Sequence, residues 1–160
     1  MRGKLRAVAG AALAVALGAA AQAAPPISTD GTDPKTWDPK TDGPIAAPAN
    51  HKVVFESDTI RIMSVTVLPG QSEPLHAHLK CAVLVFDRPT KIVNRDGHGN
   101  VLTDAVVLAQ IPWQAPGAPK QVPFVWLQPP EALHSITNID THALHLTRVE
   151  MKNGCDAPPA

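Results

Sequence analysis

The stretch Gly70-Gln71-Ser72-Glu73-Pro74-Leu75-His76-Ala77-His78 decides how the rest of this sequence is interpreted. Pro69 and Gly70 before it predict a turn, and the residues that follow are suited to an extended segment. Successive side chains of an extended segment alternate between two faces, so His76 and His78 are expected on the same face. Two imidazoles on one face can bind one metal ion, although such a pair also occurs without any metal.

A third histidine has a comparable setting later in the chain. His134 follows the turn-forming run Pro129-Pro130-Glu131 and opens a predicted strand. From there it can complete a set of three imidazoles on a divalent metal while coordination positions stay open.

Short β-branched runs alternate with turn residues from His51 onward, which is typical of an all-β domain. The 17 prolines argue against a helical bundle. Short strands must hide their edges, so a small sandwich or barrel is expected, and a jelly roll is the simplest choice. The predicted strands are Lys52–Glu56, Thr59–Leu68, Cys81–Asp87, Lys91–Asn94, Val101–Ala109, Val122–Leu127, Ser135–Ile139 and Ala143–Lys152.

Three connections between these strands have their own signatures. Asp96–Asn100 contains two glycines and predicts a hairpin turn, and Ile139–His142 is interpreted as a second hairpin. Ile111–Pro123 holds four prolines and is predicted to be a loop, because proline cannot donate to a central ladder.

The start of the chain differs from this strand pattern. The basic start and the apolar run Ala7–Ala21, followed by the small residues around Gln22, predict a signal peptide that is cleaved after Ala23. The apolar run is shorter than the roughly 20 residues of a spanning helix. We therefore expect an exported, periplasmic or secreted protein with no membrane association after cleavage.

Residues 24–50 are rich in Pro, Gly, Asp and Thr and predict an extended arm or linker without a core of its own. Two interpretations are open. The segment can be a solvated spacer, or it can pack across the domain or a partner with Trp37 as its anchor. The domain proper is then 51–152, and 153–160 form a C-terminal tail.

The charge balance argues against nucleic acid as a partner. The chain has 14 basic and 14 acidic residues, but Arg2, Lys4 and Arg6 lie in the leader, which leaves the mature protein mildly acidic. Tyrosine is absent and aromatic residues make up 4% of the chain, so the core must be aliphatic.

These histidines and their surroundings resemble the two sequence motifs of the cupin family. Gly70, His76 and His78 match the first motif, and Pro129, His134 and Asn138 match the second. The resemblance covers about His51 to Lys152. It implies a cupin-type jelly-roll β-barrel in which His76, His78 and His134 hold Fe, Mn, Ni, Cu or Zn, and it makes a homodimer an expectation.

The sequence also departs from the cupin pattern. The glutamate that normally supplies a fourth ligand is missing, because Ala82 and Val83 stand at its positions. The glycine that ends the first motif is replaced near Pro89 or Thr90, and Pro123 and Glu131 stand where the second motif has glycines. The three-histidine set resembles the iron site of thiol dioxygenases, although the chain has no tyrosine for the crosslink found in some of them.

Other polar residues are candidates for supporting roles. Glu73 and Glu131 lie near the motif histidines and are candidates for proton transfer, support of a ligand or replacement of one, or are simply solvated. His145 becomes a fourth imidazole of the cavity if its strand face points inward. No role is assigned to His51, His98 or His142.

Cys81 and Cys155 allow a disulfide in an oxidising compartment, two inert thiols, or a thiol beside the metal.

Three functions remain open from the sequence. The first is an enzyme of dioxygenase, isomerase or lyase type, in which the uncompensated charge of the metal favours a small anionic substrate. The second is a non-catalytic module that binds a metal or small ligand. The third is a structural barrel with a vestigial site, in which Leu75, Val83 and Leu133 should cover the histidines.

Overall fold

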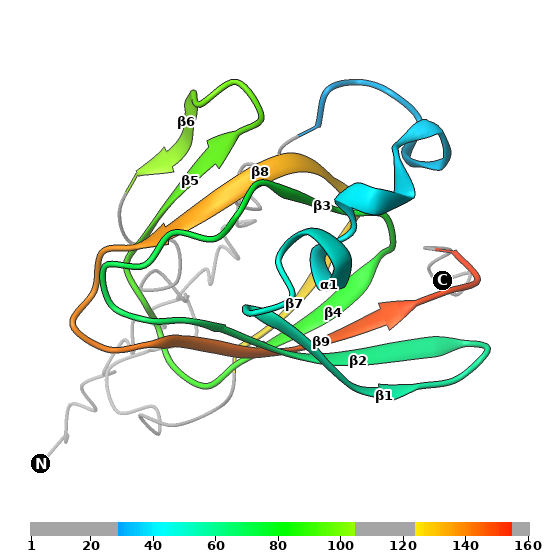
Figure 1. Ribbon diagram of the computed structural model, residues 1–160. Coiled ribbons are helices and arrows are strands. Elements are labelled where there is room, and N and C mark those ends of the chain that lie inside the picture. Colours follow the sequence, from blue (N-terminus) through cyan, green and yellow to red (C-terminus); the bar gives the residue numbers. More distant parts are fainter. Residues whose placement is uncertain (1–28, 105–123, 155–160) are drawn as a thin grey trace, which may run out of the picture.

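The computed structural model describes residues 29–104 and 124–154, which form two antiparallel sheets that face each other (Figure 1). The all-β prediction with jelly-roll architecture is confirmed. One sheet has the strand order β1-β2-β9-β4-β7 and the other has the order β3-β8-β5-β6. The strands are β1 (His51–Glu56), β2 (Ile60–Val67), β3 (His76–His78), β4 (Ala82–Phe86), β5 (Ile92–Asp96), β6 (Val101–Asp104), β7 (Phe124–Gln128), β8 (Glu131–Asn138) and β9 (Leu144–Met151).

Two strands differ from their predicted form in ways that matter for the site. The segment that carries His76 and His78 pairs as a strand of its own, β3. Strand β8 begins at Glu131, four positions before the predicted start at Ser135, so His134 lies within a ladder and not at its opening. The predicted end of the Val101–Ala109 strand and the predicted loop Ile111–Pro123 fall on 105–123, outside the described residues.

One predicted hairpin is confirmed and the other is wrong. Asp96–Asn100 joins the paired strands β5 and β6. Residues 139–143 bend as expected, but they cross from β8 in one sheet to β9 in the other. The buried Asn138 stabilises this crossing, because its amide donates to the carbonyls of Val67 and His142 and its oxygen accepts from the N–H of Asp140.

The predicted extended arm is wrong for its last part. Residues 43–46 form the short helix α1 (Gly43–Ala46), which lies against β1 and β3, and Asp42, Ala47 and Asn50 are buried. Asp42 also bridges to Ala77 of β3. This end of the arm is therefore part of the domain, because its polar side chains find partners there. Trp37 is only half-buried and donates to the Thr32 hydroxyl, so it is no anchor for the core.

The apolar core lies toward one end of the space between the sheets. Alternate residues of β2, β4 and β9 point inward and form one apolar cluster. The cluster ends at the positions along these strands where the inward-facing residues are polar. A buried aliphatic side chain stabilises by roughly 1.5–3 kcal/mol, so this cluster is a main source of stability. Its members are Met63, Val65, Val67, Ala82, Leu84, Phe86, Ile92, Leu144 and Leu146.

Within the described ranges no helix is long and apolar enough to cross a membrane. The predicted leader falls on residues 1–23, outside those ranges. Cys81 is disulfide-bonded, and Cys155, the other cysteine of the sequence, lies beyond the described residues.

Candidate metal centre

Strands β3 and β8 bring the motif histidines together. His76 lies directly opposite His134, and His78 lies opposite Glu131. An advance of two residues along β3 therefore corresponds to three residues along β8, which is the irregular pairing of a β-bulge. The extra residue allows Glu131 and His134, which would otherwise face opposite sides of the sheet, to share one face.

Two of these imidazoles are oriented in the same way by the backbone. His76 Nδ1 lies 2.8 Å from the Pro74 carbonyl and His134 Nδ1 lies 2.9 Å from the Ala132 carbonyl. A carbonyl oxygen can only accept, so each Nδ1 carries the hydrogen and each Nε2 keeps its lone pair. The Nε2 atom of His76 is buried without a hydrogen-bond partner. A donor atom in that state is what a metal ligand requires.

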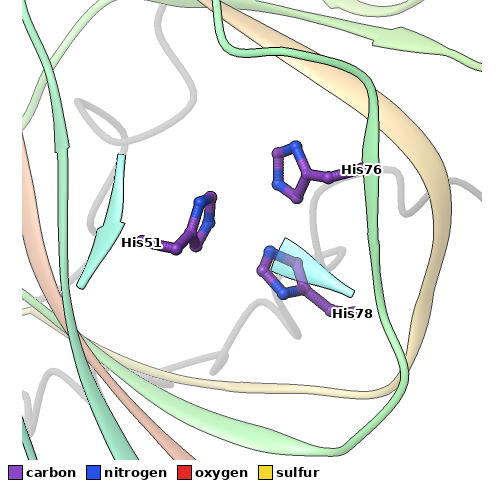
Figure 2. Close-up of side chains that lie close together, drawn as sticks. All are labelled: His51, His76 and His78. Carbon is purple, nitrogen blue, oxygen red and sulfur yellow. The ribbon is translucent and has the colours of Figure 1, made fainter. Parts of the chain in front are cut away.

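His51 joins this group from the first strand of the other sheet (Figure 2). Its ring centroid lies 4.5 Å from that of His76 and 5.1 Å from that of His78. Its Nδ1 faces the Ala47 carbonyl at 3.4 Å, which again leaves Nε2 as the free nitrogen. The sequence offers no reason to assign His51 a role, and the structure places its ring within the imidazole cluster.

His78 is shared by three buried groups of ligating side chains. In each group, atoms from the three members lie within 4.8 Å of one another. The ring of His78 is 4.9 Å from that of His76 and 5.3 Å from that of His134, and its Nδ1 is buried without a hydrogen-bond partner. The groups are His51, His76 and His78; His78, Glu131 and His134; and Asp42, His78 and Glu150.

Burial keeps all four imidazoles neutral. It is the main cause that lowers the pKa of His51 to about 2 and that of His134 to about 4, and it holds the pKa values of His76 and His78 well below the usual range. Neighbouring imidazoles and the positive charge of Arg148 act in the same direction. Neutral imidazole is the form that binds a metal, so the rings are ready to bind without losing protons.

The two candidate glutamates are both buried beside this cluster, which removes the interpretation of solvated carboxylates. Glu73 Oε1 lies 3.8 Å from His51 Nδ1, and burial, followed by the negative charge of Glu131, raises the pKa of Glu73 to about 8. Glu131 accepts hydrogen bonds from Asn94 at 3.3 Å and from Gln128, and its carboxylate lies 3.5 Å from His134 Nε2.

Comparison with known proteins gives likenesses in fold only. No protein-family model and no curated protein matches the sequence. A cupin domain from Bordetella pertussis Tohama I is 14% identical, with 64% of this chain and 91% of that chain covered and a TM-score of 0.45. An RmlC-like cupin with a double-stranded β-helix fold from Methanocaldococcus jannaschii is 12% identical over 63% of this chain and 77% of its own, with a TM-score of 0.40.

A third solved structure, an RmlC-like cupin from Desulfovibrio desulfuricans, is 16% identical over 66% of this chain and 86% of that chain, with a TM-score of 0.37. In the present chain, the residues of both motifs meet between two antiparallel sheets. The domain is a jelly roll that brings the two cupin-like motifs together. What it binds must come from its own residues, because identities this low concern the fold alone.

Neither of the two residues at the position of the missing cupin glutamate can provide a ligand atom in its place. Ala82 is buried and offers no donor atom, and Val83 is on the outer face of β4. The ring of His51, from β1, is the fourth imidazole of the cluster. The fourth imidazole is not His145, which lies on the outer face of β9, because the inward residues of β9 are Leu144, Leu146, Arg148 and Glu150.

Apolar residues do not cover the imidazoles in the way that a vestigial barrel predicts. Leu75 is 44% exposed and Leu133 is 37% exposed, so both point away from the cluster. Buried polar groups lie among the imidazoles instead, including Glu73, Asn94 and Glu131.

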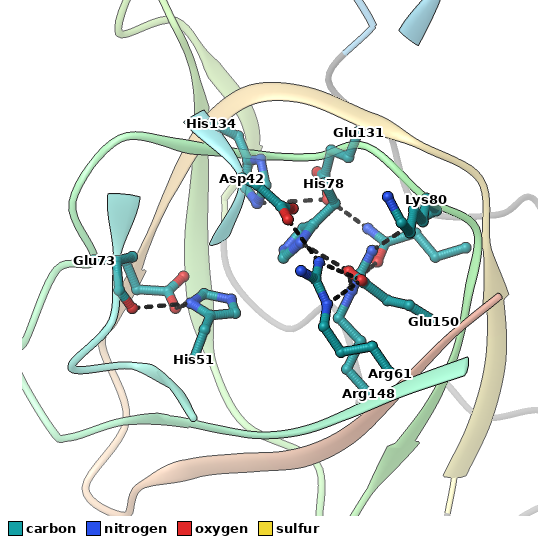
Figure 3. Close-up of polar contacts among 12 residues, drawn as sticks. Asp42, His51, Arg61, Glu73, His78, Lys80, Glu131, His134, Arg148 and Glu150 are labelled. Atoms are coloured by element: carbon teal, nitrogen blue, oxygen red, sulfur yellow. Dashed lines mark hydrogen bonds and ion pairs between the residues drawn. The ribbon is translucent and has the colours of Figure 1, made fainter. Parts of the chain in front are cut away.

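A buried polar network supports the site from the five-stranded sheet (Figure 3). Arg61 contacts Asp42 at 2.7 Å and also donates to Glu150, which in turn accepts from Arg148 Nε at 3.0 Å. Arg148 donates to Gln128, and Gln128 donates to Glu131 beside His134. Burial lowers the pKa of Arg148, although Glu150 opposes this effect. The network thus links Asp42, which precedes α1, to the imidazole of His134.

Two features of this network were not predicted from the sequence. Asp42 belongs to a segment interpreted as a linker, and Arg148 and Glu150 alternate with valine and threonine in a way that does not show which face is buried. The one available signal was an Arg and a Glu two positions apart in a strand, which places both charges on the same face.

Proposed function

We propose that this chain is an exported cupin that holds one divalent transition metal through His76, His78 and His134, with His51 as a fourth ligand. The proposal depends mainly on one observation. Three imidazoles from β1, β3 and β8 donate their Nδ1 hydrogens to backbone carbonyls, which leaves their Nε2 lone pairs available, and the His51 and His134 ring centroids lie 4.5 Å and 4.3 Å from that of His76. Structural histidines need no such common orientation.

The donor set fits the proposed metal. Neutral nitrogen ligands suit Fe, Mn, Ni, Cu or Zn better than Mg²⁺ or Ca²⁺, which prefer oxygen. A bound dication would act as a Lewis acid and attract a small anionic molecule, because four imidazoles do not compensate its charge. Glu73 and Glu131 are the candidates for proton transfer, since both carboxyl groups are buried beside the imidazoles.

Elemental mass spectrometry tests the metal. The protein is purified without chelators and without a histidine tag, beside the double variant His76→Ala/His134→Ala and the control His98→Ala, whose histidine lies in the exposed β5–β6 turn. We expect about one equivalent of a transition metal in the wild type and the control, and its loss in the double variant. Absence of metal from the wild type after reconstitution with all five metals would refute the proposal.

A second candidate is a non-catalytic module in which the metal is held but not used. The observation that favours it is the near-complete burial of all four rings together with the fourth nitrogen donor. Four protein ligands around one metal are typical of structural sites, whereas catalytic sites keep a position open.

Cobalt substitution separates the two candidates. Co²⁺ is added to the metal-free protein, and its visible absorption is recorded with and without azide, a small anion that binds open coordination positions. A change on addition of azide is expected for a catalytic site. An unchanged spectrum supports the non-catalytic module.

Export and oligomeric state are part of the same proposal. N-terminal sequencing of the protein from a periplasmic or culture fraction should give Ala24 as the first residue. A homodimer is also proposed, and light scattering coupled to size exclusion measures it directly. A cytoplasmic protein with an intact Met1 would contradict the export proposal and would leave the metal site untouched.

A further inference from the structure

A chain of three polar side chains lies on the outer face of the five-stranded sheet, on the side of the sheet away from the imidazole cluster. Ser64 Oγ lies 3.1 Å from His145 Nε2, and His145 Nδ1 contacts the carboxylate of Asp87. Ser64 lies in β2 and His145 in β9, and Asp87 directly follows β4. None of them belongs to the metal centre.

The register of the sheet explains why these residues meet. His145 pairs directly with Thr66, and Thr147 pairs with Ser64, so Ser64 and His145 are diagonal neighbours on one face. The backbone N–H of Asp87 donates to the carbonyl of His145, which places its carboxylate beside the ring. The sheet therefore holds the three side chains in fixed order.

The order of the contacts determines the direction of hydrogen bonding. A carboxylate can only accept, so Nδ1 of the neutral imidazole carries the hydrogen and donates to Asp87. Nε2 then has a lone pair that accepts from the Ser64 hydroxyl. Nucleophile, base and orienting carboxylate are connected as in the serine hydrolase triads.

The surroundings of Ser64 indicate what it can react with. The side chain of His145 is 39% exposed and that of Asp87 is 54% exposed, so a reagent can approach. The row of residues next to Ser64 on the same face is apolar across four strands, and it can receive an acyl chain. This row consists of Ile62, Val149, Val83 and Leu127.

We propose that Ser64, His145 and Asp87 form a second site, which transfers acyl groups from activated esters to the Ser64 hydroxyl. Ser64 Oγ attacks the ester carbonyl as its proton moves to His145 Nε2, and the carbon–oxygen bond to the leaving group breaks. The leaving alcohol takes the proton from His145. Water then attacks the acyl-serine with His145 as base, which releases the carboxylic acid and restores the hydroxyl.

The sheet also limits the substrate class. β2 and β9 are both interior strands of the five-stranded sheet, so their backbone N–H groups are used in the ladders and are not available to stabilise an oxyanion. Removal of one such donor costs about 100- to 1,000-fold in rate in hydrolases. The site is therefore assigned to esters with good leaving groups and not to amides.

The test uses the full chain with p-nitrophenyl acetate, followed by intact mass and peptide mapping. When the reaction is stopped with acid before the acyl-serine is hydrolysed, we expect one acetyl group on Ser64 and none at this position in Ser64→Ala. The rate of p-nitrophenol release should be at least about 100-fold lower in Asp87→Asn. Thr147→Ala is the matched control, because it removes a hydroxyl directly opposite Ser64 on the same face. This variant should release p-nitrophenol at the same rate as the wild type.

Two further measurements keep the outcome clear. Ser64→Cys should regain acylation at position 64, which separates a lost nucleophile from a disturbed fold. His98→Ala should react like the wild type, because this histidine lies in the exposed β5–β6 turn of the other sheet. Acetylation on lysine or on His145 instead of Ser64, or equal rates in wild type and Asp87→Asn, would overturn the proposal.

Discussion

His76 and His134 lie directly opposite each other on the antiparallel strands β3 and β8, with ring centroids 4.3 Å apart. Each ring donates its Nδ1 hydrogen to the carbonyl two residues earlier in its own strand. Each motif of the sequence thus contributes one ring of this pair.

His51 should contribute to metal affinity although it lies outside both motifs. His51→Ala is expected to weaken binding by at least the roughly 10- to 100-fold that is typical for a residue that orients a ligand. Competition with a metal-sensitive dye measures the affinity, and His142→Ala serves as the control because that ring binds the Pro89 carbonyl outside the cluster. Equal affinities in wild type and His51→Ala would limit the ligand set to the motif histidines.

The metal-free protein should lose stability in mild acid. Burial holds the folded pKa of His134 at about 4, below its ordinary 6.5, and lowers those of His51, His76 and His78 as well. The unfolded chain therefore binds more protons as the pH falls below 6.5, and each pKa unit is worth about 1.4 kcal/mol. Urea midpoints at several pH values between 7 and 4.5 should fall steeply.

The variant His76→Asn/His134→Asn is the control for this pH series. It lacks two of the four titrating rings, so the fall in its urea midpoint should be shallower. Parallel curves for the variant and the wild type would assign the acid sensitivity to other groups.

Glu73 should have the opposite pH dependence. Its folded pKa is raised to about 8, chiefly by burial, above an ordinary value of 4.5. The folded state therefore binds the extra proton, and stability from this group is lost as the pH rises from 4.5 through 8. In metal-free Glu73→Gln this loss should disappear, so the variant gains stability over the wild type toward pH 9. A constant difference across that range would contradict the raised pKa.

Breaking the buried ion-pair network should be costly. Glu150→Gln leaves Arg61 and Arg148 buried without their shared carboxylate, and we expect a loss of about 3–5 kcal/mol in the free energy of unfolding. Lys152→Met is the matched control, because it breaks the exposed pair with Glu56, which is worth about 1 kcal/mol or less. Chemical unfolding at pH 7 compares the two, and similar losses would show that the network contributes no more than a surface pair.

The apolar end of the domain should respond as an ordinary core. Met63→Ala removes a fully buried side chain of the main cluster and should cost about 2–5 kcal/mol. Val54→Ala changes a side chain that is 63% exposed on β1, and its effect should stay within about 0.5 kcal/mol. A small effect of Met63→Ala on the thermal midpoint would mean that this end is loosely packed.

Local patterns were enough to predict much of this architecture. Alternating β-branched runs and turn residues predicted the strands, because both depend on neighbours within a few positions. The spacing of His76 and His78 placed both rings on one face for the same reason. The link to His134 came from the resemblance to the cupin motifs.

The tertiary structure decided which other residues belong to the site. His51 enters it because β1 pairs with β2 so that His51 lies opposite Val65, whose face is buried. Glu131 enters it through a bulge in β8, and Asp42 through an ion pair with Arg61. Register, bulges and contacts between distant segments depend on the whole packed chain, so no local pattern of residues encodes them.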